Sequence, residues 1–165
     1  MRPVATAALL CAAALFASCA APLKETRVLS QAPRFSLVIA TRKTAFKERL
    51  IGELIERYRL DADIAVVRLS ALARVKAEDY DVVLIIDSSL AWTLFSPALK
   101  AFLRKTEDKG KLILFMTAAN TGWRYSYRGV DAITSASTED RMDSALALLS
   151  ERIDRIAEQA GCLRK

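Results

Sequence analysis

An unbroken apolar run near the middle of the chain, residues 82–86, constrains the fold more than any other feature. A strand with one face in water alternates apolar and polar side chains, and this run does not. It therefore predicts a strand buried on both faces, as in a parallel sheet with helices on each side. Ligands of such sheets bind in the loops beyond the carboxyl ends of the strands. The loop that follows Asp87 and contains Trp92 is thus a candidate site.

Strand-like and helix-like segments alternate along the rest of the chain. Four more strands are predicted by short apolar segments, at residues 35–41, 63–69, 112–117 and 130–135. Apolar residues at helical spacing predict helices at 44–59, 97–105 and 138–159, with a helical turn or two within 70–79. The expected fold class is α/β, a doubly wound sheet of five parallel strands in the order 2-1-3-4-5, in three α/β/α layers.

The central segment also resembles flavodoxin-like proteins. The residues that carry the resemblance are Tyr80-Asp81 before the apolar strand, Ser88-Ser89-Leu90 and Trp92 after it, and the helix sequence PALKAFL at 97–103. Residues 111–117 (KLILFMT) are similar to the family's fourth strand, and the match spans roughly residues 36–157. The resemblance implies a flavodoxin-like domain, FMN as cofactor and electron transfer as the activity.

In that family the FMN phosphate binds the loop after the first strand, which here is Thr41, Arg42, Lys43, Thr44 and Ala45. Hydroxyls, basic side chains and a helix N-terminus suit a phosphate. The family's pattern contains a glycine that this loop lacks, and a side chain at that position crowds an approaching phosphate. Anion binding and a plain charged turn capped by Thr44 both stay open.

Two further loops would flank the flavin ring. Ser88, Ser89 and Trp92 match the loop that brings an aromatic side chain against one face of the ring, because indole and flavin are both flat and polarisable. Thr117 and the loop that follows it, with Trp123 and Tyr125, match the second flanking segment. Alternatively, Trp92 packs under its own loop, and residues 118–129 form a small hairpin or an interaction surface.

The composition excludes several kinds of chemistry. The chain has no histidine, which removes Ser-His catalysis and His-ligated metals, so no catalytic or metal residue is assigned. Asp87 and Thr117 match two positions of a phosphate-accepting receiver domain. The acidic pair that would hold Mg²⁺ is replaced by Ala40 and Thr41, so that function is rejected. Whether the protein is an enzyme stays open; an active one would be an FMN-dependent electron carrier or reductase.

The first residues predict export. Arg2, an apolar stretch and small residues form a signal peptide over 1–18. Phe16-Ala17-Ser18-Cys19 resembles a bacterial lipobox, which implies lipidation of Cys19. Ordinary cleavage after Ala20 and an uncleaved anchor are the alternatives. Residues 19–34 are expected to form a lipidated tether with a reach of roughly 50 Å, and 35–160 the flavodoxin-like domain. The location expected is the cell envelope, lipid-anchored on the periplasmic or surface side of a membrane.

The net charge and the expected export limit the classes of partner that the protein can have. The formal net charge of +6 favours anions, but basic and acidic residues interleave and export argues against nucleic acid as a partner. The expected partners are the membrane, through the lipid on Cys19, and a redox partner protein. Two hypotheses follow. The protein binds FMN and transfers electrons, or it is a cofactor-free lipoprotein that acts as a binding or scaffold module of the cell envelope.

Overall fold

A single mixed sheet runs through the computed structural model, which describes residues 23–88, 96–118, 125–127 and 129–162. It has seven strands in the order β1-β3-β2-β4-β5-β7-β6. Their bounds are β1 Thr26–Val28, β2 Phe35–Thr41, β3 Ala62–Arg68, β4 Val82–Ser88, β5 Leu112–Thr117, β6 Tyr125–Tyr127 and β7 Val130–Ser135. All strands predicted from the sequence are present, each within about a residue or two of its expected bounds.

The five inner strands are parallel, and their order β3-β2-β4-β5-β7 is the predicted 2-1-3-4-5. The prediction of five strands was two short, because three-residue antiparallel strands pair with each outer parallel strand. Strand β1 lies inside the segment expected to be a tether. Strand β6 forms a hairpin with β7, one of the two alternatives for that loop, and Gly129 takes a φ of +83° at its turn.

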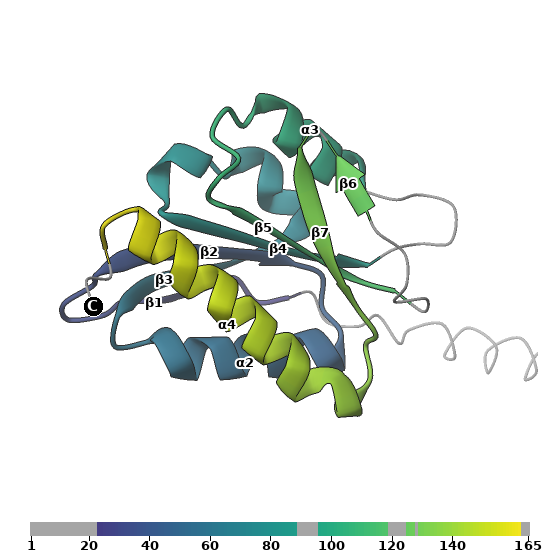
Figure 1. The fold of residues 1–165 in the computed structure, drawn as a ribbon, viewed down its shortest axis with the longest axis horizontal. Helices are drawn as coiled ribbons and strands as arrows, with labels where there is room; N and C mark the ends of the chain where they lie inside the picture. The colour runs from purple at the N-terminus through teal and green to yellow at the C-terminus, as the bar shows by residue number, and fades with distance from the viewer. Residues whose placement is uncertain (1–22, 89–95, 119–124, 128, 163–165) are drawn as a thin grey trace, which may run out of the picture.

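Helices cover both faces of the sheet and complete the three layers (Figure 1). Helices α2 (Ala45–Tyr58) and α4 (Met142–Gln159) pack on one face. Helix α3 (Pro97–Lys105) and the 3₁₀ helix η2 (Leu69–Arg74) pack on the other, and a second 3₁₀ turn, η3, spans Ala77–Asp79. In the described part of the chain, no helix combines the length and apolarity needed to cross a bilayer.

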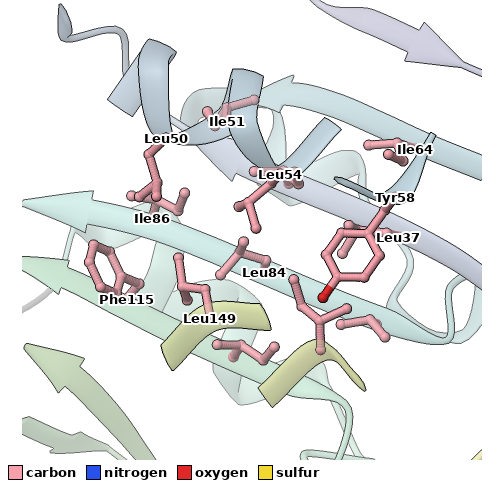
Figure 2. Packing of buried hydrophobic residues seen from close by; sticks show 14 of the residues in the cluster. Leu37, Leu50, Ile51, Leu54, Tyr58, Ile64, Leu84, Ile86, Phe115 and Leu149 are labelled. Carbon is pink, nitrogen blue, oxygen red and sulfur yellow. The ribbon is translucent and has the colours of Figure 1, made fainter. Parts of the chain in front are cut away.

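Strand β4 is buried on both faces, as its unbroken apolar sequence predicted. Val82, Leu84 and Ile86 belong to the core under α2 and α4, whereas Val83 and Ile85 belong to the core under α3 and η2. In Figure 2, Leu84 and Ile86 of β4 lie in the first core with Leu50 and Leu54 of α2 and Leu149 of α4. Residues 82–86 of β4 are all fully buried, so this strand links the two cores.

Local sequence signals set the helix starts. Thr44 caps α2 by accepting a hydrogen bond from the Lys47 amide, and Ser96 caps α3, with Pro97 in its first turn. The final helix differs from the expectation. Helix α4 begins at Met142, and the residues expected to start it, Glu139–Arg141, form a separate 3₁₀ turn. Thr138 precedes that turn without a capping hydrogen bond.

Tyr58 joins the two helices of the first face. Its hydroxyl donates to the Asp154 carboxylate at 2.8 Å and lies 3.2 Å from the Ser150 carbonyl. Its ring packs edge-on against Phe35, with 5.8 Å between centroids. Burial, together with the neighbouring Asp154 carboxylate, raises the pKa of Tyr58 to about 12. The hydroxyl therefore stays protonated and holds α2 against α4 over the whole physiological pH range.

We expect Leu84→Ala to lower the free energy of unfolding by about 2–5 kcal/mol, because it opens a cavity in a fully buried strand. Leu148 is 47% exposed on α4 and serves as the control. Leu148→Ala should change stability by no more than about 0.5 kcal/mol. Urea unfolding of both variants measures the difference, and equal losses would contradict the central role of β4.

Candidate functional site

Polar side chains converge where β2, β4 and β5 end, the position at which doubly wound sheets bind ligands. Thr41 ends β2 beside Ile86 of β4, and Ser88 ends β4 beside Thr117 of β5. The Thr41 hydroxyl lies 3.1 Å from the Ile86 carbonyl. Thr41 and Thr117 are buried, so these hydroxyls bond within the protein.

Lys47 completes this network from the first turn of α2. Its ammonium donates to the Ser88 hydroxyl at 2.7 Å, and that hydroxyl lies 3.1 Å from the Thr117 hydroxyl. The Lys47 residue is only 1% exposed. Burial lowers the pKa of Lys47, and the nearby Asp87 carboxylate opposes part of that shift. We call this region at the ends of β2, β4 and β5 the crevice floor, and the protein's own cation occupies it.

Asp87 is the buried anion of the same floor, also 1% exposed. Its Oδ1 accepts the Ser88 amide at 2.8 Å and lies 3.6 Å from the Arg42 guanidinium. Its Oδ2 is buried and has no hydrogen-bond partner among the described residues. Such an atom is costly unless a cation lies close by. Lys47 and Arg42 supply that charge.

Lys47 was not predicted from the sequence. Apolar residues at helical spacing predicted this helix, but no function was assigned to the lysine in its first turn. The signal was present, because Lys47 lies four residues before Ile51 and seven before Leu54, on the buried stripe. A lysine at a core position of an amphipathic helix is rare unless its charge is paired.

The five residues expected to bind a phosphate lie together, and most are exposed. Thr44 caps α2, and Ala45 is the first residue of that helix. The cations of the loop are already paired. Lys43 lies 3.3 Å from Glu48 in the first turn of α2, and Arg42 pairs with Asp87. The segment is thus a charged turn capped by Thr44, and the carboxylates of Glu48 and Asp87 lie beside it.

A groove of about 610 Å³ opens beside this loop, between the ends of β2 and β3 and the start of α3. We call it the basic groove. Its lining includes Leu23, Arg42, Lys43, Arg68, Pro97 and Ala98. None of the described residues that line it is acidic. Arg68 pairs with Glu25 just outside the lining, at 3.2 Å. The groove thus combines apolar walls with cations of moderate net charge.

The remaining predicted site residues lie in the hydrogen-bonded network, in β6 or outside the described residues. Ser88 and Thr117 belong to one hydrogen-bonded network, in which the structure brings them together with Lys47. Ser89, Trp92 and Trp123, the predicted ring contacts, lie outside the described residues, as does Cys19. Tyr125 opens strand β6.

Comparison with known proteins adds little to this geometry. No protein-family model and no curated protein matches the chain. Among solved structures, a flavodoxin from the domain Archaea matches with a TM-score of 0.44 and 14% sequence identity, over 73% of this chain and 98% of that chain. The strand order and the helices on both faces, described above, are what make the fold flavodoxin-like.

We expect Lys47→Met to destabilise the protein by about 3–5 kcal/mol, because it removes a cation from beside the buried Asp87 carboxylate. Adding Asp87→Asn should recover much of that loss, since it removes the uncompensated charge and keeps the acceptor for the Ser88 amide. Chemical unfolding of the single and double variants measures the coupling. Losses that simply add would show that the two charges do not interact.

The pH dependence of stability supplies the control for this pair. The folded pKa of Lys47 lies below its ordinary value of 10.5, so the unfolded chain binds more protons in the window between them. The free energy of unfolding should therefore gain a rising component as pH increases toward about 10.5. Lys47→Met should lack that component, whereas Lys43→Met, which changes an exposed lysine, should keep it.

Proposed function

We propose that this protein is an exported, lipid-anchored flavodoxin-like module that binds an anionic partner at the cell envelope without a bound cofactor. Acylation of Cys19 would hold it on a membrane, since the lipobox-like sequence around that cysteine directs such a modification. The binding surface is the basic groove at the carboxyl ends of the strands. No catalytic step is assigned, because the described polar groups of the crevice floor hydrogen-bond to one another.

The single observation that carries this proposal is the internal pairing of the crevice floor. Lys47 donates to Ser88 at 2.7 Å, and both Lys47 and Asp87 are 1% exposed. A flavodoxin-like site that served a cofactor would direct such groups toward the ligand. Here the charges at the ends of β2 and β4 stabilise the domain itself. Beside the crevice floor, the described residues that line the basic groove present cations to an external molecule.

The charges around the groove favour a singly charged anion over a doubly charged one. Arg42, Lys43 and Arg68 each have a carboxylate within 4 Å, so their positive charge is partly neutralised. A phosphomonoester such as that of FMN carries about two negative charges, and Glu48 and Asp87 would repel it. A phosphodiester or a carboxylate carries one. The part of the predicted FMN site that the structure describes, the phosphate loop, therefore fits FMN poorly.

FMN binding with electron transfer is the second candidate. The observation that favours it is the N-terminus of α2 beside the groove, where the first amides of the helix lack intrahelical partners and the Thr44 hydroxyl can still donate. In that case residues 41–45 would hold the phosphate. Trp92 and an aromatic residue of the 118–129 loop would then flank the ring. The flavin would supply the redox chemistry, and the protein only binding and orientation.

The two candidates differ in one titration. Micromolar FMN should keep its fluorescence when the purified mature protein is added, because the groove does not suit its phosphate. Quenching that saturates would support the flavoprotein instead. Trp92→Ala should then weaken binding by roughly 1–3 kcal/mol, the range for base–aromatic stacking. Lys43→Ala should weaken it as well if the phosphate sits on the predicted loop.

Acylation is tested by feeding cells a clickable fatty acid. The expressed full chain should incorporate the label, and Cys19→Ser should abolish incorporation because it removes the acceptor thiol. Cys162→Ser is the matched control and should leave labelling unchanged, since that cysteine lies at the far end of the chain. Label retained in Cys19→Ser, or absent from the native chain, would refute the lipid anchor.

A further inference from the structure

Strand β1 determines where the chain enters the domain. It runs antiparallel to β3, with Thr26 opposite Val66 and Val28 opposite Ile64. The amino end of β1 therefore lies toward the carboxyl end of β3. The basic groove lies at this same end of the parallel strands. Leu23, three residues before β1, is itself part of the groove lining. The chain thus enters at the candidate site and not at the opposite edge.

The distance from this entry to the anchor is short. Leu23 is the fourth residue after Cys19, and fully extended chain spans at most about 3.6 Å per residue. The groove therefore lies within roughly 15 Å of an acylated Cys19. The tether of residues 19–34 was expected to reach roughly 50 Å, but most of it is occupied by the β1 strand and the turn after it.

The surface presented at this edge suits a membrane interface. The groove has apolar walls at Leu23, Pro97 and Ala98, with cations at Arg42, Lys43 and Arg68. Lys24 and Arg74 add positive charge nearby, and the carboxylates of Glu25, Glu48 and Asp87 balance only part of the total. Long basic side chains over apolar walls match the boundary between lipid headgroups and acyl chains.

We propose that the basic groove docks on the anionic phospholipid surface of the membrane that carries the anchor. This proposal rests on the lipid anchor of the proposed function and names the partner of its groove. Phosphodiester headgroups, each with one negative charge, approach Arg42, Lys43 and Arg68. The short chain from Cys19 holds the carboxyl ends of the parallel strands against the bilayer. The amino ends of these strands, about 20 Å away along β4, face away from the membrane.

The test measures orientation in the full acylated protein. In a Cys162→Ser background, Ser70→Cys places a fluorophore at an exposed residue of the groove lining. Glu107→Cys places it at an exposed residue near the amino end of β5, on the opposite edge. Both proteins are reconstituted into phosphatidylcholine vesicles with phosphatidylglycerol and a headgroup-linked contact quencher. The fluorophore at position 70 should be quenched several-fold more than that at position 107.

Two further arms test the charge contribution. Vesicles of phosphatidylcholine alone should weaken the contrast between the two positions, and this arm needs no further substitution in the labelled proteins. Arg42→Gln, Lys43→Gln and Arg68→Gln together should weaken it too, with roughly fivefold lower affinity for the surface for each cation removed. Equal quenching at both positions, or a contrast indifferent to anionic lipid, would overturn the docking proposal.

Failure of the anchor is distinguishable from failure of docking. A protein that carries no acyl chain would not insert into the vesicles, and the fluorophores at both positions would then remain unquenched. An anchored protein that lacks the contrast would keep the proposed function and lose only this inference.

Discussion

Strand β4 can bury its apolar side chains only if helices lie on both faces of the sheet, and most of the architecture follows from that requirement. The residues that alternate along β4 belong to two separate cores. One needs α2 and α4, and the other needs α3 and η2. Parallel neighbours on each side are joined through these helices, because a parallel connection must cross from one end of the sheet to the other. The doubly wound order is the compact solution.

The same arrangement brings polar strand ends into a region with little water. A buried carboxylate is tolerated only beside a compensating charge, and Asp87 has Lys47 and Arg42. In many doubly wound proteins this position belongs to a ligand. Here a lysine from α2 occupies it. The domain therefore gains internal order at the crevice floor, and accessible cations line the basic groove beside it.

The fold was predictable because strand burial and helix amphipathicity leave periodic patterns, and the five inner strands and three main helices each carried one. Strand β1 carries none: three residues at an exposed edge need no apolar alternation, so TRV resembles a linker. The site was predicted less well. The segment from Thr41 to Ala45 joins β2 to α2 as expected, and its role in binding stays a prediction. Lys47 was missed because a lysine suggests solvent. Its partner Asp87 lies far away in sequence, so no local pattern links the two.

The two short outer strands have a consequence for how copies of the protein meet. A parallel sheet that ended at β3 and β7 would expose rows of backbone amides and carbonyls, which invite edge-to-edge pairing and aggregation. Strands β1 and β6 cover those rows with only three residues each. A three-residue edge offers too few hydrogen bonds to recruit another chain. When copies of the protein meet, these short outer strands offer little backbone to pair with, so such encounters stay brief.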